Sequence, residues 1–358
     1  LPGAQLTPLK PLLFCADFEL PQGMPMPFLP HARQFFPNAV SVRADSIRAW
    51  SEELTRAIMA QVPEDRPWAL HIEPHYGVRQ VHRVGARAWH SMSRTHTQPR
   101  QANPEPGVDP VAGKNRCALI RTALLELLRK KRRHVLKNLR AEPAPFTRDD
   151  CLVQTCLTAP DSGFISVAPA PLPYEQRHLV SFLPMGRVEV ASDKAAPSRA
   201  FAKLVESEIR LGRRIQRGET CVDLGAAPGS WTYVAAARGA RVLAVDRSPL
   251  REDLMCHRSV EFVTHDAFTF KPPQPVDWLL CDVIAEPERS AELLTEWLEN
   301  RWTNAFVVTL KLKDSPESVE MLDRVAVRLR DLVSELRISR LCANKKEVCV
   351  FGCRERVG

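Results

Sequence analysis

The sequence has no hydrophobic run long enough to cross a membrane. A transmembrane helix needs about 20 mostly apolar residues in a row, and even a run of about 18 is missing. The first residues, LPGAQLTPLKPLLFCADFELP, also lack the basic stretch followed by an unbroken apolar core that marks a secretory signal. These absences favour a cytoplasmic protein without a membrane partner.

Closely spaced cysteines are missing as well. The ten cysteines are scattered from Cys15 to Cys353 and form no CxxC pair, whereas zinc sites and disulfide frameworks depend on such spacing. Several of the cysteines lie inside apolar, strand-like runs, which is typical of small buried thiols. We therefore expect neither a metal site nor a disulfide framework.

The composition is that of a folded protein with more than one domain. Hydrophobic residues make up 44% and charged residues 26% of the 358 residues, which is too apolar for a disordered chain. At about 100–200 residues per domain, this length predicts two or three domains. We expect a short N-terminal segment (1–45), a first domain (46–168), a linker (169–194) and a second domain (195–358).

The first domain should combine helices and strands. Apolar residues recur at helical spacing in 46–62, with Asp45 or Ser46 as the N-cap, and again in 117–139. Short apolar runs predict strands at 68–73, 151–158 and 164–168. Residues 75–115 are rich in His, Arg, Pro and Gly without a sustained pattern, and we interpret them as an insertion or loop.

Positive charge is concentrated in one part of this domain. Lys and Arg exceed Asp and Glu by 50 to 42 in the whole chain, for a net charge of +8, but by 11 to two within residues 114–148 alone. Clustered basic side chains bind phosphate groups without reading a base sequence, although the same charges also fit an ordinary solvated helix surface. The candidate phosphate-binding residues are Arg129, Lys130, Lys131, Arg132, Arg133 and Lys137.

The second domain has the pattern of a doubly wound α/β fold. Apolar strands alternate with helix-like stretches, which predicts a mostly parallel sheet covered on both faces. The expected strands are 220–224, 241–246, 260–266, 277–282 and 304–311. Segments 334–341 and 347–353, joined by the turn CANKK, should form a hairpin that adds an antiparallel strand at or near the end of the sheet.

The loop VDLGAAPGSW (222–231) follows the first of these strands and opens a helix, which is where open α/β sheets bind ligands. Gly225 and Gly229 let the backbone turn and approach a bound molecule closely. The loop lacks the GxGxxG pattern of dinucleotide sites, which disfavours a nicotinamide-dependent oxidoreductase.

Three strand ends carry an aspartate near this loop. Asp246 is placed to hydrogen-bond ribose hydroxyls, and Asp266 to meet an adenine amino group. Each acid alone could simply cap a helix, but Asp223, Asp246 and Asp266 around a neutral glycine loop predict an S-adenosylmethionine pocket. The expected cofactor-binding residues are Asp223, Gly225, Ala227, Pro228, Gly229, Trp231, Asp246, Asp266 and Asp282.

From residue 196 onward the sequence resembles the Rossmann-like RNA methyltransferases that modify ribose 2′-hydroxyls. The motifs are APSRAFAKLVE, VDLGAAPGSWTY, AVDRSPL, THDAFTF, LLCDVIAEP, VVTLKLK and KKEVCVFG, in that order. They are most similar to the ribosomal RNA large subunit methyltransferase M family, which modifies a cytidine of 23S rRNA. The resemblance implies methyl transfer from S-adenosylmethionine to 23S rRNA, before the large subunit is fully assembled. The first domain resembles, less closely, the family's THUMP RNA-binding domain, and its basic residues would then bind RNA.

On this resemblance the catalytic residues are a Lys-Asp-Lys-Glu tetrad, namely Lys203, Asp282, Lys311 and Glu347. A ribose hydroxyl must lose its proton as it attacks the methyl group, and a base with a pKa near the working pH does this best. We assign Lys311 as the base, with Lys203 lowering its pKa and stabilising the developing alkoxide. Asp282 would orient Lys311 and face the methyl donor, and Glu347 would position the second lysine or the ribose. Both carboxylates oppose the lowering of the pKa, so its net direction stays open.

Other methyl acceptors fit the sequence less well. Enzymes that methylate base amino groups usually carry an Asp/Asn-Pro-Pro-aromatic run after the fourth strand, where this chain reads CDVIAE. Methylation of a base carbon needs a nucleophilic cysteine, and the side chain of Cys281 should point away from Asp282 on a strand. Lys313 lies on the same strand face as Lys311, but Lys311 stands at the family's position. The alternatives that remain are a different RNA target and a non-catalytic RNA-binding or assembly factor with the same fold.

Overall fold

A computed structural model of the chain distinguishes two compact units. The described residues are 5–10, 13–17, 29, 32–76, 110–141, 149–172, 176, 178–312, 316–341, 343–344 and 346–355. Unit 1 comprises Leu1–Pro25 and Phe36–Glu175, and unit 2 comprises Met26–Phe35 and Gln176–Gly358. Each unit has its own hydrophobic core and is described by itself.

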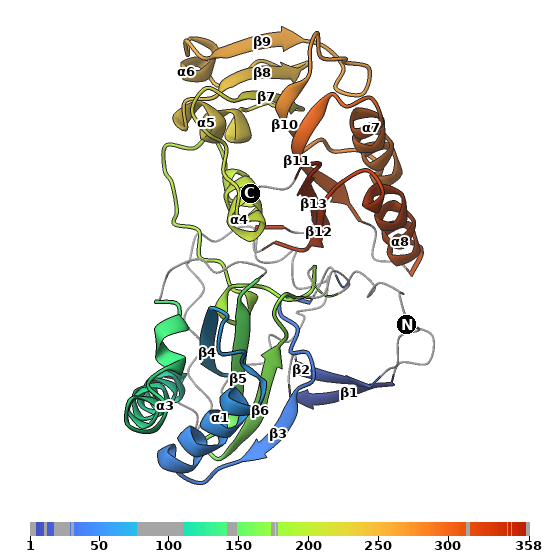
Figure 1. Cartoon of the computed structure of the whole chain (residues 1–358). Coiled ribbons are helices and arrows are strands. Elements are labelled where there is room, and N and C mark those ends of the chain that lie inside the picture. Colours follow the sequence, from blue (N-terminus) through green and yellow to red (C-terminus); the bar gives the residue numbers. More distant parts are fainter. Residues whose placement is uncertain are drawn as a thin grey trace, which may run out of the picture. The chain divides into compact units, whose positions relative to one another are not determined.

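Unit 1 contains a four-stranded sheet with two helices on one face (Figure 1). The strands lie in the order β3 (Val40–Arg43), β6 (Ser162–Ala168), β5 (Cys151–Ala159) and β4 (Trp68–Pro74). Alternate residues of β4, among them Trp68 and Leu70, share one apolar core with α1 (Ile47–Gln61) and α3 (Pro110–Lys131). A separate antiparallel pair, β1 (Gln5–Lys10) and β2 (Leu13–Asp17), lies in the N-terminal segment, where the sequence shows little periodicity.

The two helices of unit 1 follow the predicted periodicity with one shifted start. α1 matches the helix expected at 46–62, and Ser46 caps it by accepting a hydrogen bond from Ala49 N at 3.0 Å. α3 begins at Pro110, so the expected loop at 75–115 is wrong for its last residues. Residues 77–109 of that predicted loop lie outside the described part of the chain.

The end of α3 also differs from its prediction. The helix ends at Lys131 instead of continuing to 139, and a short 3-10 turn, η2 (Val135–Asn138), follows. The indole of Trp68 donates a hydrogen bond to Val135 O at 2.9 Å, and Arg140 N donates to Trp68 O at 2.8 Å. These tertiary contacts draw the chain back to β4, and they override the helical periodicity of the sequence.

Unit 2 is built on a seven-stranded sheet in the order β12-β13-β11-β10-β7-β8-β9 (Figure 1). The strands are β7 (Thr220–Leu224), β8 (Arg241–Asp246), β9 (Val260–Thr264), β10 (Val276–Cys281), β11 (Thr303–Lys311), β12 (Glu335–Ser339) and β13 (Glu347–Cys353). The strands from β11 to β9 are parallel, and β13 runs antiparallel to both β11 and β12. The predicted mostly parallel sheet and the hairpin at its end are confirmed.

Helices cover both faces of this sheet, which confirms the doubly wound α/β fold. Leu279 faces the core formed with α7 (Pro287–Glu299) and α8 (Pro316–Arg330), as does the fully buried Cys281. Trp278 and Leu280 face the opposite core, formed with α4 (Phe201–Leu211) and α5 (Ser230–Ala237). This alternation follows from the strand period of two. A short helix, α6 (Glu252–Met255), follows β8. Within the described residues, no helix has the length and hydrophobicity that crossing a membrane requires.

Candidate active site

Four charged residues meet at one edge of the unit 2 sheet, and the topology explains why. β10 and β11 are parallel neighbours, so Asp282, directly after β10, and Lys311, the last residue of β11, lie at the same edge. β13 is antiparallel to β11 and begins at that edge with Glu347, the register partner of Lys311. Lys203 comes from the first turn of α4, which contacts β13. The structure thus brings together the four residues predicted as the catalytic tetrad.

Each lysine of the tetrad contacts both carboxylates. Lys203 Nζ lies 3.1 Å from Glu347 Oε1 and also forms an ion pair with Asp282 Oδ2. Lys311 Nζ donates a hydrogen bond to Asp282 Oδ1 at 2.8 Å and another to Glu347 Oε2. Each carboxylate therefore presents one oxygen to each lysine, and the four side chains form a closed ring of alternating charge.

The ring is largely removed from solvent. The exposed fraction of the side chain is 6% for Lys203, 10% for Glu347, 18% for Asp282 and 23% for Lys311. Burying a charge is costly unless the charge is paired, and the two positive and two negative charges balance here. Lys311 is the most exposed member of the ring. Lys313 lies outside the described residues.

The carboxylates decide the pKa of Lys311. Burial by itself lowers this pKa, but the charge of Asp282 and the hydrogen bonds to Asp282 and Glu347 outweigh burial and hold the pKa above its ordinary value. For Glu347, burial raises the pKa, and the hydrogen bond from Lys311 and the charge of Lys203 reverse this, bringing the pKa to about 2. The direction that the sequence leaves open for Lys311 is therefore upward.

The glycine loop borders the tetrad through Val283, the residue after Asp282. A Cβ atom on Gly225 would lie 2.5 Å from Val283 Cγ2, and the φ of +72° at Gly225 is one that L-residues rarely adopt. Gly229, with a φ of +107°, immediately precedes α5, and a Cβ atom there would overlap Leu254. Both glycines therefore permit a close approach that a side chain would block. Ala227 and Pro228 lie between them on the loop.

Two of the predicted cofactor acids hold backbone groups at the ends of their strands. Asp246 ends β8 and accepts hydrogen bonds from Ala227 N at 3.0 Å and Ser248 N at 2.9 Å. Asp266 follows β9, accepts from Phe268 N at 2.8 Å through Oδ1 and pairs with Arg247 through Oδ2. A carboxylate has about four acceptor positions, so both acids retain lone pairs for a ligand. Among the residues that the structure describes, no group of three His, Cys, Asp or Glu could hold a metal ion.

Two other predicted cofactor residues face the interior. Asp223 is 2% exposed and accepts a hydrogen bond from Thr232 Oγ1 at 2.6 Å, and burial raises its pKa to about 7. Trp231 is equally buried; its indole donates to Ala200 O at 2.9 Å, and its ring lies 6.0 Å from Lys203 Nζ. These side chains support α5 and Lys203, and their direct contact with a cofactor stays a prediction.

Asn344 is a neighbour of the tetrad that no sequence pattern revealed. It lies between β12 and β13, and its Nδ2 donates a hydrogen bond to Glu347 Oε1 at 3.1 Å. Asparagine is common in turns for purely local reasons, so the residue type gives no signal of a role in the site. Its position three residues before Glu347 is the one hint that the sequence offers.

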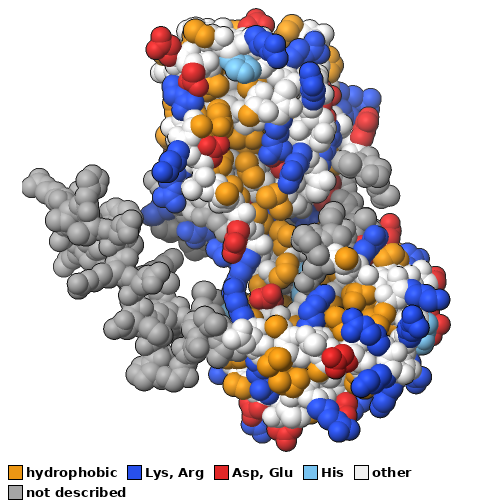
Figure 2. Space-filling model, turned by 90° about the vertical axis from the view of Figure 1, so that its left-hand side faces the viewer, with side chains coloured by type: hydrophobic (Ala, Val, Ile, Leu, Met, Phe, Trp, Pro, Cys, Tyr) orange, Lys and Arg blue, Asp and Glu red, His pale blue; other side chains and the backbone are white. Residues whose placement is uncertain are grey.

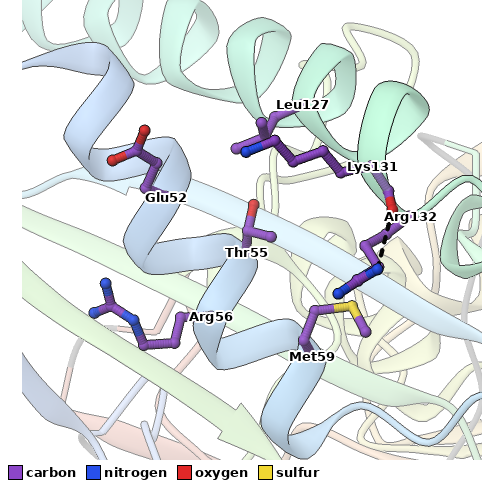
Figure 3. Close-up of a pocket in the computed structure, with 7 residues that line it drawn as sticks. All are labelled: Glu52, Thr55, Arg56, Met59, Leu127, Lys131 and Arg132. Carbon is purple, nitrogen blue, oxygen red and sulfur yellow. Dashed lines mark hydrogen bonds between the residues drawn. The ribbon is translucent and has the colours of Figure 1, made fainter.

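The six basic residues singled out in the sequence are all exposed on unit 1. They lie on the last turn of α3, on η2 and on the link between these two elements. Figure 2 shows the side of unit 1 that carries α3, where Lys and Arg side chains are widely spread. A groove of about 430 Å³ lies between α1 and α3. Its lining, drawn in Figure 3, consists of Glu52, Thr55, Arg56, Met59, Leu127, Lys131 and Arg132.

Comparison with known proteins gives consistent similarities for this chain. Residues 196–338 match the model of the FtsJ-like methyltransferase family. A ribosomal RNA large subunit methyltransferase M from Thauera aminoaromatica is 40% identical over 201 residues, which is 52% of this chain and 54% of that protein. The proteins of the same name from Laribacter hongkongensis and Azoarcus sp. are 38% identical over 182 residues and 37% identical over 178, covering 48% and 47% of this chain and 52% and 49% of theirs.

The matched part contains most of the site, but Glu347 and Asn344 lie beyond its end. The chain spans about half the length of the curated relatives it matches. The family match begins just before α4 and ends within β12, so it contains Lys203, the glycine loop, Asp282 and Lys311. Residues 196–338 therefore have the FtsJ-like, Rossmann-type methyltransferase fold, and the chain resembles the ribosomal RNA large subunit methyltransferase M family.

Proposed function

We propose that the protein transfers a methyl group from S-adenosylmethionine to a ribose 2′-hydroxyl of RNA. The observation that carries the proposal is the closed ring of Lys203, Asp282, Lys311 and Glu347 beside the glycine loop. The substrate we propose is large-subunit ribosomal RNA, for which the curated relatives are named. On the resemblance of the sequence motifs we further propose a cytidine of 23S rRNA as the target, before the large subunit is fully assembled. With this substrate, the enzyme would act in the cytoplasm.

The residues around the glycine loop fit S-adenosylmethionine. When bound, this cofactor supplies a methyl group on a positively charged sulfur. The carboxylates of Asp246 and Asp266 have free lone pairs for hydroxyl and amino groups, as required for a nucleoside. Asp282 lies at the same sheet edge, where its carboxylate is paired with Lys203 and Lys311. Gly225 and Gly229 let this loop pack closely against Val283 and Leu254, which fixes the path of its backbone at the edge of the site.

Lys311 is the proposed base. Lys311 Nζ would take the proton of the 2′-hydroxyl as its oxygen gains the methyl group, and the cofactor would leave as a neutral thioether that keeps the electron pair of its former bond to the methyl carbon. Only the neutral amine can accept that proton, and Asp282 and Glu347 favour the ammonium form. The fraction of active enzyme should therefore be small at neutral pH and grow as the pH rises. Lys203, held by the same carboxylates, would stabilise the alkoxide.

The basic residues of unit 1 form the proposed RNA-binding surface. We also propose that unit 1 is a THUMP-like domain. Arg129, Lys130 and Arg133 are exposed on the same short stretch as Lys131 and Arg132, which line the α1–α3 groove. Phosphate contacts from such residues would supply affinity without choosing the sequence. Selection of the target nucleotide would then depend on other features of the RNA.

The test is methyl transfer from labelled S-adenosylmethionine onto RNA from cells of the same source that lack this protein, followed by nucleoside analysis. Labelled 2′-O-methylcytidine confined to large-subunit RNA is the expected result. Label on another 2′-O-methylnucleoside or another RNA would retain the chemistry and reject the proposed target. Absence of transfer to an acceptor known to be unmethylated, with cofactor binding intact, would instead favour a non-catalytic RNA-binding or assembly factor.

A further inference from the structure

Asn344 is almost completely buried although it lies in the connection between two strands. Only 8% of the residue is exposed. It comes between β12 and β13, three residues before Glu347. A buried amide must satisfy both its carbonyl oxygen and its amino group, so the partners of Asn344 show what it does.

The amide of Asn344 has three partners among the residues that the structure describes. Its Oδ1 accepts a hydrogen bond from Leu341 N at 2.6 Å, while its Nδ2 donates to Glu347 Oε1 at 3.1 Å and to Cys349 Sγ at 3.6 Å. Nitrogen and oxygen of an amide are distinguished by their partners. The backbone N–H of Leu341 requires the oxygen, and the carboxylate requires the amino group, so the orientation of this amide is fixed from both sides.

Asn344 donates its hydrogen bond to only one of the two carboxylate oxygens of Glu347. Oε1 receives Asn344 and Lys203, whereas Oε2 receives Lys311. The terminal torsion of a glutamate side chain is broad and nearly two-fold, so the lysines alone permit the carboxylate to turn or to tilt toward one of them. A third, neutral donor on Oε1 removes that freedom.

We propose that Asn344 is a positioning residue that fixes the Glu347 carboxylate between Lys203 and Lys311. This role rests on the proposed function of the tetrad. Through Glu347, Asn344 determines how firmly Lys311 is held and where its amino group lies relative to a ribose hydroxyl. Asn344 itself would touch neither the cofactor nor the RNA.

The charge balance around Glu347 supports this assignment. The charged groups that face Glu347 are Lys203 from α4 and Lys311 from β11, and Asp282 lies across the ring. The thiol of Cys349 lies on β13, the strand that also carries Glu347. Burial raises the pKa of Glu347, and the bonds from Lys311 and Asn344 are among the interactions that bring it to about 2. Asn344 thus stabilises the ionised carboxylate without adding a charge.

Two substitutions separate positioning from turn formation. Asn344→Asp keeps an oxygen for Leu341 N but replaces the N–H donors with a carboxylate oxygen that repels Glu347, whereas Asn344→Ala removes these three bonds without adding a charge. We expect kcat for methyl transfer to fall by about 10- to 100-fold in both variants, the range of one lost hydrogen bond to a charged group. The KM values for RNA and cofactor should change little. Wild-type kcat in Asn344→Asp would overturn the proposal, because the amide would then serve only the turn.

The pH profile provides a readout that a purely structural role would not move. In Asn344→Ala a loosened Glu347 favours the Lys311 ammonium less, so the rising limb of kcat should shift to lower pH. The matched control is Asn304→Ala, because Asn304 Oδ1 accepts from Glu355 N at 3.1 Å near the opposite end of β11. The control should keep the wild-type kcat and profile. An equal loss in the control would overturn the positioning role, since it would reflect general weakening of these strands.

A substrate-free measurement distinguishes failure of this proposal from failure of the proposed function. The carboxyl carbon of Glu347 can be titrated by NMR in the wild-type chain and in Asn344→Ala. The pKa of Glu347 should rise in the variant, whether or not any RNA accepts a methyl group. Absence of methyl transfer in the wild type together with this shift would reject the function and keep the contact. An unchanged pKa would overturn the positioning role even in an active methyltransferase.

Discussion

At the scale of single residues, Lys311 has to change its charge during the proposed reaction, yet its neighbours resist that change. Asp282 and Glu347 both accept hydrogen bonds from it and raise its pKa. We therefore expect kcat to rise with pH through the neutral range and to level off only at alkaline pH. Initial rates with saturating RNA and cofactor, measured from about pH 6 to about pH 10, test this. A plateau already below neutrality would mean that Lys311 is not the group that titrates.

The same residue gives a direct test of the base. Lys311→Ala should reduce methyl transfer by at least about 100-fold, the usual contribution of a general base. Cofactor affinity should stay near the wild-type value, because the glycine loop does not depend on this side chain. Transfer is measured with labelled cofactor and affinity by calorimetry. The matched control is Lys271→Ala, because Lys271 is an exposed lysine that stacks 5.7 Å from the Trp302 ring. Loss of cofactor binding in Lys311→Ala would show that its role is misassigned.

Asp223 predicts a pH dependence of stability rather than of rate. Burial raises its folded-state pKa to about 7, so its contribution to stability is fully present below the unfolded value of about 4 and is lost as the pH rises through about 7. Asp223→Asn stays neutral and can still accept the hydrogen bond from Thr232. The variant should therefore be more stable than the wild type at about pH 8 and similar to it at about pH 4. Urea unfolding at both pH values tests this, and equal stabilities at the higher pH would contradict it.

At the scale of helices and strands, the sequence predicts unit 2 better than the end of α3. The strands β7 and β8 have the predicted bounds because each apolar run ends at a charged or glycine-rich turn. α3 stops early because Trp68, distant in sequence, hydrogen-bonds the Val135 carbonyl. Local periodicity does not contain that contact.

The same distinction applies to the site. Strand ends predict where Asp282, Lys311 and Glu347 lie, because parallel and antiparallel neighbours meet at a common edge. Which atoms pair, and that Asn344 joins them, depends on side-chain torsions that no spacing encodes. The inward direction of Asp223 likewise depends on Thr232 in the following helix.

The turns on either side of β7 give a prediction for the stability of the protein. Gly225 and Gly218 both have positive φ, +72° and +87°, so alanine at either position costs about 1–2 kcal/mol in backbone strain. A Cβ on Gly225 would lie 2.5 Å from Val283 Cγ2, whereas nothing lies within 4 Å of a Cβ on Gly218. Gly225→Ala should therefore lose about 1–3 kcal/mol more than Gly218→Ala and should bind cofactor more weakly. Denaturant unfolding and calorimetry measure the two effects. Equal losses in both variants would mean that the loop moves away from Val283 without penalty.

At the scale of the whole molecule, charge and chemistry are divided between the two units. The tetrad of unit 2 is balanced, with two lysines paired to two carboxylates. The excess of basic residues lies within residues 114–148 of unit 1, which contain 11 Lys and Arg but only two acidic residues. A neutral reaction centre and a separate basic surface are the arrangement expected when affinity for a polyanion and transfer chemistry depend on different residues.

This division predicts how RNA binding responds to salt. Replacing Arg132 and Arg133 by glutamine should weaken RNA binding for all sequences tested. The slope of log K against log salt should fall by about 1 for each phosphate that the variant no longer binds. The matched control replaces Arg324 and Arg328, two exposed arginines of α8, and so removes the same charge from unit 2. Binding is measured by fluorescence anisotropy over a range of salt concentrations. If the control lowers the slope equally, affinity follows the net charge of the chain. If only the unit 1 variant lowers the slope, RNA phosphates contact the link between α3 and η2, and affinity for RNA depends on residues outside the tetrad.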